Sequence, residues 1–208
     1  MHAVNFGCGT SIAPGWVNYD ASPTLRLQRM PLVGVLARRF TTPVFPAEVR
    51  FGDVTTRLAE ASASCDLVYC SHILEHLALE DLRSALRETL RILKPGGVFR
   101  GVLPDLESAC RHYLEDPDPS ACSRFMASSH LGMESRPKGA AARLRQLFGN
   151  AAHLWMWDFK GLAAELSDAG FSDIRRAELG DSASDVFTAI EVPQRWHDCL
   201  GFECRRPD

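Results

Sequence analysis

Short apolar runs rich in β-prone residues alternate along this chain with longer stretches in which leucines recur every three or four positions. Five runs in the first half predict strands over residues 3–6, 16–19, 49–51, 66–70 and 98–103. Two late runs predict strands over 174–179 and 186–192. Runs that are apolar without strict alternation are typical of strands covered on both faces.

The leucine-rich stretches predict helices between these strands. The leucines at 79, 82, 86, 90 and 93 form one helical face, and Pro95-Gly96-Gly97 ends that helix. A second helix over 162–169 is closed by Gly170. The alternation predicts an α/β fold, a doubly wound and mostly parallel seven-stranded sheet. Ligands bind such sheets at the edge where the strands end.

Residues 105–160 are too many for a single crossover between the fifth and sixth strands. Most of this segment has a helical composition, and the aromatic cluster Trp155-Met156-Trp157 lies near its end. We predict one domain over 1–208 with 105–160 as an inserted helical lid over the strand edge. An elaboration that only packs on the surface explains the composition equally well.

The bulk composition favours one globular domain. The chain has 208 residues, 46% of them hydrophobic, and a net charge of −3, which argues against a protein that holds nucleic acid by bulk charge. Seven scattered cysteines without metal-binding spacing predict reduced thiols and no metal site. The N-terminal stretch does not resemble a signal peptide, and no apolar run is long enough to span a membrane, so we expect a cytoplasmic protein.

A glycine loop after the first strand is the main chemical signal. Gly7-Cys8-Gly9 lets the backbone bend tightly and approach a ligand closely, and its amides can bind a carboxylate. Asp20 and Asp53 follow the second and third strands. They could accept from ribose hydroxyls and an adenine amino group, although turn and cap aspartates are common at such positions.

Two other nucleotide-binding motifs fit poorly. A dinucleotide fingerprint needs a third glycine where this chain has Ile12, and an acid about 20 residues further on. Asp20 follows Gly9 by only eleven residues, so it is too close to the glycine loop to be that acid. The Gly-Lys-Ser/Thr of a phosphate-binding loop is absent from the sequence.

The ensemble of motifs resembles the class I S-adenosylmethionine-dependent methyltransferases of the type 11 group. The similar stretches are Asn5-x-Gly7-Cys8-Gly9, Pro14-Gly15-Trp16-x-Asn18-x-Asp20, His72-x-x-Glu75-His76, Leu93 to Gly97, Pro104-Asp105 and Gly170-Phe171. The resemblance implies S-adenosylmethionine as cofactor, held by Gly7, Cys8, Gly9, Asp20, Asp53, Val54, Ser71 and His72. One departure is that residues 10–15 are too few for the helix that usually joins the first two strands.

The sequence leaves the reaction less defined. Methyl transfer from a sulfonium needs an in-line nucleophile, and a base only for a hydroxyl acceptor. His72, His153 and Asp158 are the candidate catalytic residues, with helix start, core packing and helix capping as the alternative roles. Relatives in carbohydrate-related pathways suggest a small-molecule acceptor with a sugar or glycan-related hydroxyl. A cofactor-binding module without turnover and an NAD-dependent oxidoreductase stay open as alternatives, as does the oligomeric state.

Overall fold

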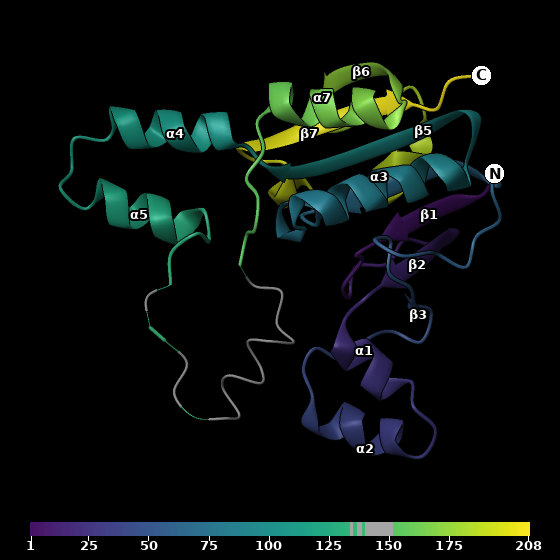
Figure 1. The fold of residues 1–208 in the computed structure, drawn as a ribbon. Coiled ribbons are helices and arrows are strands. Elements are labelled where there is room, and N and C mark those ends of the chain that lie inside the picture. Colours follow the sequence, from purple (N-terminus) through teal and green to yellow (C-terminus); the bar gives the residue numbers. More distant parts are fainter. Residues whose placement is uncertain (134, 137–138, 140–151) are drawn as a thin grey trace.

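The computed structural model describes residues 1–133, 135–136, 139 and 152–208 as a seven-stranded sheet with helices (Figure 1). The strand order is β3-β2-β1-β4-β5-β7-β6. The first five strands pair in parallel, and β7 is antiparallel to both of its neighbours. The predicted α/β, mostly parallel seven-stranded sheet is therefore confirmed. The strands are β1 (Ala3–Phe6), β2 (Trp16–Asp20), β3 (Arg50–Phe51), β4 (Cys65–Ser71), β5 (Leu93–Pro104), β6 (Ser172–Ala177) and β7 (Cys199–Arg205).

The seventh strand is not where the sequence predicted it. Residues 186–192 do not form a strand but include the 3-10 turn η2 (Asp185–Ala189). The strand is β7, within a tail whose structure the sequence did not indicate. Its apolar positions 200, 202 and 204 alternate and are buried in the main core, whereas Gly201 and Glu203 face the other side. Phe187 packs instead against Trp16 and Tyr69, which is why the apolar run looked like a strand.

Two helices cover one face of the sheet. These are α3 (Leu79–Ile92) and α7 (Phe159–Ala169), which lie side by side in Figure 1 and enclose the main core. Gly170 ends α7 in the left-handed conformation at φ 102°, as the sequence predicted. On the other face, η2 and η3 (Pro193–Arg195) follow β6, and Phe187 and Trp16 belong to a second cluster there.

Side-chain amides hold the link between β1 and β2, which contains no helix, as its length predicted. Nine residues can still return the chain along a four-residue strand, because each spans up to about 3.3 Å. Asn5 Nδ2 donates to Asn18 Oδ1 at 3.1 Å and to the carbonyl of Ser11 at 3.4 Å. Both asparagines are almost fully buried and are cross-strand neighbours. They therefore fix the short link where a helix would otherwise do so.

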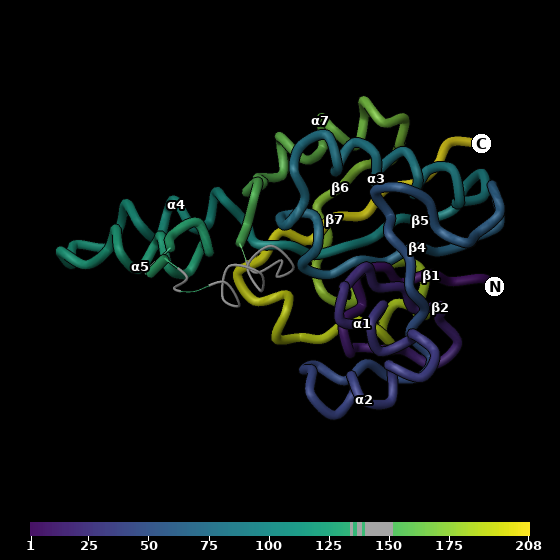
Figure 2. The backbone as a smooth tube through the Cα atoms, turned by 60° about the horizontal axis from the view of Figure 1, so that its bottom comes forward, coloured from purple at the N-terminus to yellow at the C-terminus, as the bar shows by residue number. Residues whose placement is uncertain are grey.

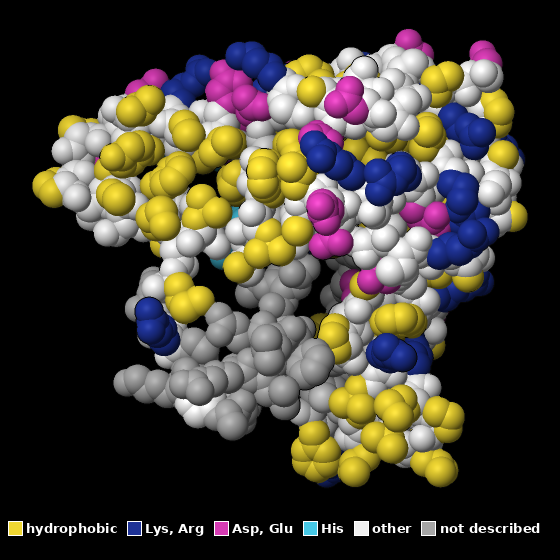
Figure 3. Space-filling model, in the orientation of Figure 1, with side chains coloured by type: hydrophobic (Ala, Val, Ile, Leu, Met, Phe, Trp, Pro, Cys, Tyr) yellow, Lys and Arg dark blue, Asp and Glu magenta, His cyan; other side chains and the backbone are white. Residues whose placement is uncertain are grey.

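Two helical excursions leave the body of the molecule. Helices α4 (Leu106–Glu115) and α5 (Ala121–Ser128) project beyond the end of β5 (Figures 1 and 2). Helices α1 (Pro23–Gln28) and α2 (Val33–Phe40) follow β2 and lie near the β3 edge of the sheet, where Figure 3 shows a hydrophobic surface that includes the exposed Val35, Leu36 and Phe40. Residues 134, 137–138 and 140–151 of the predicted insertion lie outside the described residues. None of the described helices is long and apolar enough to cross a membrane.

Candidate active site

A cavity of about 630 Å³ opens where β1, β2 and β4 end. Loops at neighbouring carboxyl ends of parallel strands meet at one edge, so residues far apart in sequence line the same space. All the residues predicted to bind a cofactor line this cavity: Gly7, Cys8, Gly9, Asp20, Asp53, Val54, Ser71 and His72. The structure thus joins the glycine loop and the two carboxylates in one cleft.

The glycine loop is held in place by Asp20. Gly7 and Gly9 have φ angles of 64° and 54°, which favour glycine. Asp20 Oδ2 accepts from the amide of Gly9 at 2.8 Å, and Oδ1 accepts from the amide of Ser22 at 2.8 Å. A carboxylate has about four acceptor positions, so each oxygen keeps one for a ligand hydroxyl. Asp20 therefore combines a turn role with the geometry of a ribose-binding acid.

The residues after β3 form a second polar corner of the cavity. Asp53 Oδ1 accepts from the amide and the hydroxyl of Thr55 at 2.9 and 2.7 Å. Val54 is buried beside it in the main core. A carboxylate that lies against an apolar wall suits an adenine ring and its amino group.

Cys8 is a packing residue of the loop. Its thiol is buried with Leu25, Phe45 and Val49, and its amide donates to the carbonyl of Tyr19. Burial, with the nearby Asp20 charge, raises the pKa of Cys8 to about 12. The thiol therefore stays protonated and does not act as a nucleophile.

His72 lies where β4 ends and has an unusual backbone conformation, with φ 55°. Its Nε2 lies 3.0 Å from the carbonyl of Arg195, and its Nδ1 lies 3.4 Å from Glu75 Oε1. Burial opposes the charged ring, but Cys199, Glu75 and the Arg195 carbonyl outweigh it and raise the pKa of His72 to about 10. A ring that is protonated at neutral pH donates hydrogen bonds and cannot serve as a general base there.

Sequence reasoning missed Arg195. This residue lies in η3, and its Nη1 donates to the carbonyl and the hydroxyl of Ser71 at 3.2 and 3.3 Å. It lines the cavity although 124 positions separate it from Ser71. Only the placement of residues 185–196 over the sheet brings it there, and no local motif signals that placement. Ile73 and His76 also line the cavity, and they lie within the His72-x-x-Glu75-His76 stretch that the sequence did single out.

A second cavity of about 560 Å³ lies between the end of β5 and helices α4 and α5. His72 and His153 both line it, so His72 belongs to both cavities. Burial lowers the pKa of His153, which keeps its ring neutral near pH 7. Asp158 does not belong to the lining of either cavity. It caps α7, and its Oδ1 accepts from the amide of Gly161 at 2.7 Å, the alternative role that the sequence left open.

Comparisons with known proteins find a matching family model and similar folds. Residues 4–100 match a family model described as a methyltransferase domain. The fold is similar to that of an S-adenosylmethionine-dependent methyltransferase from Methanosarcina mazei, with a TM-score of 0.51, 16% identity, and coverage of 99% of this chain and 92% of that one. It is also similar to an S-adenosylmethionine-dependent methyltransferase from Thermotoga maritima, with a TM-score of 0.50, 15% identity and coverage of 99% and 82%.

A third similar structure is a chain in the complex between the Haloferax volcanii Trm112 methyltransferase activator and a methyltransferase. It has a TM-score of 0.50 and 17% identity, over 100% of this chain and 83% of that one. No curated protein matches the chain. Identities this low carry the fold only.

Proposed function

Since residues 4–100 of this chain match the methyltransferase-domain family model and its fold is similar to that of S-adenosylmethionine-dependent methyltransferases, we propose that it is such an enzyme and that it O-methylates a sugar or glycan-related small molecule. The methyl donor is S-adenosylmethionine. The hydroxyl acceptor and the cofactor contacts are the proposed parts. The observation that carries the proposal is that two cavities meet at His72.

The cofactor cavity fits a sulfonium nucleoside. Gly7 and Gly9 leave room for the methionine part, and Asp20 and Asp53 offer acceptors to the ribose and the adenine. When bound, S-adenosylmethionine supplies a methyl group on a positively charged sulfur, which needs a close in-line nucleophile and the exclusion of water. Ser71 and His72 lie at the end of the cavity that borders the second one.

The second cavity fits a small polar acceptor. A volume of about 560 Å³ is within the usual range for small-molecule sites. Tyr113 and Phe125 pack together in its wall with ring centroids 5.6 Å apart, and Asp105 and Ser108 supply polar groups. Aromatic faces with adjacent hydroxyl and carboxylate groups suit a sugar ring. On this proposal, the described part of the 105–160 insertion supplies most of the acceptor side of the site.

The protonated ring of His72 has a positioning role in this scheme. Its two N–H groups face the Arg195 carbonyl and Glu75, which hold the ring, so on this proposal it shapes the junction of the two cavities and makes no hydrogen bond of its own to the acceptor. The proton of the acceptor hydroxyl must therefore leave to water or to another group.

Cofactor binding is tested with Asp20→Asn and with Asp168→Asn, an exposed α7 residue, as the matched control. Asp20→Ala would remove both acceptors that hold the loop, whereas Asp20→Asn keeps one of them and turns an NH2 group toward the other backbone amide, so urea unfolding is measured beside binding to separate a disturbed loop from a lost ribose contact. Hydrogen bonds to a charged group contribute about 1.5–3 kcal/mol each, so S-adenosylhomocysteine should bind Asp20→Asn at least about tenfold more weakly by calorimetry. Unchanged affinity would contradict the ribose role. NAD binding in place of S-adenosylhomocysteine would favour an oxidoreductase.

The acceptor is tested separately by incubating the protein with methyl-labelled cofactor and a metabolite extract. Mass spectrometry should find the label on a hydroxyl oxygen of a carbohydrate-related compound. Label on a nitrogen, a carbon or a macromolecule would contradict the acceptor class. Tight S-adenosylhomocysteine binding with no labelled product would favour a binding module without turnover.

A further inference from the structure

We propose that Glu75, His76 and His153 form a binding site for a divalent transition metal, with Zn²⁺ the best match. Nitrogen and oxygen donors from these three side chains lie within 4.8 Å of one another. Two imidazoles and one carboxylate are the protein ligands of many catalytic zinc sites, where a fourth position stays open. His76 also lines the first cavity and His153 the second, so the site lies between them, and it does not depend on the identity of the acceptor. It also departs from the sequence-based expectation of no metal.

Glu75 is the strongest sign of a missing partner. Its side chain is fully buried, and both carboxylate oxygens lack a hydrogen bond among the described residues. Burying a carboxylate is costly unless it is paired or bound to a metal. The nearest cation is His72, whose Nδ1 lies 3.4 Å from Oε1, longer than the roughly 2.7–2.9 Å of a charge-assisted hydrogen bond. This long contact does not involve Oε2, which has no partner in the part of the chain that the structure describes.

The two histidines already present nitrogen atoms toward this carboxylate. His76 Nδ1 lies 3.0 Å from the carbonyl of Ala152, so Nδ1 carries the hydrogen and Nε2 has the free lone pair. That Nε2 lies 4.0 Å from Glu75 Oε1. A backbone carbonyl that fixes the ring in this way is the usual outer partner of a metal-bound histidine. His153 Nδ1 is buried and also has no hydrogen-bond partner among the described residues.

The dimensions allow a tetrahedral ion after a small contraction. Zinc bound at about 2.0–2.2 Å holds its ligand atoms roughly 3.3–3.5 Å apart. The side chains would have to move by about 1 Å to close the present spacing. The rings of His76 and His153 are 4.9 Å apart at their centroids, and the exposed His130 lies at the same distance from His153. The three side chains line a further cavity together with His72 and His130, and these two residues also line the second cavity described above.

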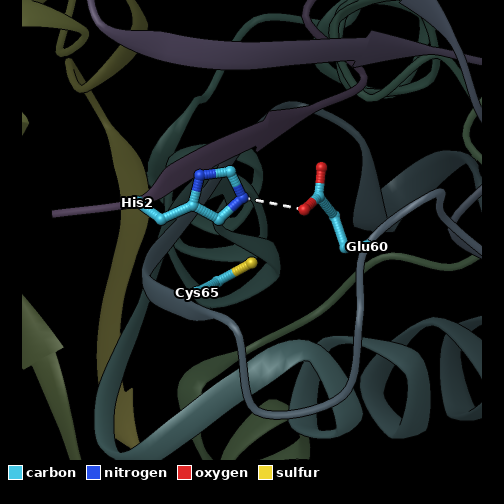
Figure 4. A group of neighbouring side chains, drawn as sticks. All are labelled: His2, Glu60 and Cys65. Atoms are coloured by element: carbon cyan, nitrogen blue, oxygen red, sulfur yellow. Dashed lines mark hydrogen bonds and ion pairs between the residues drawn. The ribbon is translucent and has the colours of Figure 1, made fainter.

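A second cluster in the protein shows what a self-contained group looks like. His2, Glu60 and Cys65 lie together at the opposite edge of the sheet (Figure 4). There His2 Nε2 lies 2.7 Å from Glu60 Oε2, and the Tyr19 hydroxyl donates to Oε1 at 2.8 Å. Both oxygens of that carboxylate are used, so it needs no ion. Glu75 has no such partners.

The test uses the full chain, stripped of metal and titrated with ZnCl₂ by calorimetry. We expect one Zn²⁺ per chain, and at least tenfold weaker binding in Glu75→Gln and in His153→Ala. His197→Ala, which removes an 82% exposed histidine, should bind as the parent does. Bound Co²⁺ should give the visible absorption of a tetrahedral nitrogen and oxygen site in the parent only.

Circular dichroism and cooperative urea unfolding show that each variant is folded, so the metal question is kept apart from the proposed function. If Glu75→Gln fails this check, His153→Ala decides. Absence of stoichiometric Zn²⁺, or equal binding by the parent and the folded variants, would overturn the proposal and leave Glu75 as the counter-ion of His72.

Discussion

Replacement of Gly7 by alanine should disturb the cofactor loop through one identifiable contact. A Cβ built at this position lies 2.2 Å from Ile73 Cδ1 and 2.3 Å from Cγ1, so the isoleucine side chain would have to move. Gly9 provides the matched control, because it also has a positive φ but no described atom within 4 Å of its added Cβ. Both variants incur the strain of a left-handed alanine, and only one adds an overlap.

The magnitudes separate the two effects. A left-handed non-glycine residue costs about 1–2 kcal/mol, and an overpacked contact costs roughly 1–3 kcal/mol more. We therefore expect Gly7→Ala to lower the free energy of unfolding by about 2–5 kcal/mol and Gly9→Ala by about 1–2 kcal/mol. Because Ile73 lines the cofactor cavity, its displacement should also weaken S-adenosylhomocysteine binding.

A double-mutant cycle with Ile73→Ala isolates the overlap. Urea unfolding of the four proteins should give a favourable coupling of about 1–3 kcal/mol, because Gly7→Ala costs less once the isoleucine is gone. Gly9→Ala with Ile73→Ala should be additive. Additivity in the Gly7 cycle, or equal destabilisation by Gly7→Ala and Gly9→Ala, would refute the steric reasoning.

Two further predictions concern the charge network around Arg100, which is fully buried and donates to Glu191 at 2.6 Å and Glu203 at 3.1 Å. Arg100→Met should lower the free energy of unfolding by about 3–5 kcal/mol in urea titrations, because it leaves buried carboxylates without a cation; a loss under 1 kcal/mol would show that they find other partners. Asp181 is desolvated, but hydrogen bonds from Arg175 and Arg100 lower its pKa to about 2, from 3.8. Its contribution to the free energy of unfolding is therefore present above pH 4 and is lost as the pH falls through 2. Asp181→Asn should lower the free energy of unfolding by on the order of 1 kcal/mol at pH 7 and match the parent near pH 2. A difference between the two proteins that does not depend on pH would contradict this.

The first five strands and helix α3 could be predicted because their signals are local. Each strand contains a short apolar run, and α3 has a leucine face. The predicted end of that helix was wrong: α3 ends at Ile92, and Pro95-Gly96-Gly97 lies within β5. The clustering of the glycine loop with two acids could be predicted for the same reason, since all three follow strands in the first half of the chain; that they bind the cofactor stays a prediction. All of the residues predicted to bind it line one cavity.

What the sequence did not predict depends on long-range placement. Strand β7 was missed because Glu203 interrupts its apolar pattern, and Arg100 and Arg175 on the neighbouring strands β5 and β6 pair with that acid. Arg195 was missed because nothing nearby in sequence ties it to Ser71. Asn5 and Asn18 were noted as motif residues, but their pairing requires the parallel register of β1 and β2.

The position of β7 has a consequence for how the chain folds as it is synthesised. β6 pairs only with β7, and β7 fills the space beside β5, so two strand edges stay bare until residues 199–205 emerge. The unpaired backbone donors and acceptors of β5 must therefore avoid pairing with other chains while about a hundred further residues are synthesised. Such unpaired edges invite association between chains, so translation speed and chaperones should influence the yield of this protein more than its final stability would suggest.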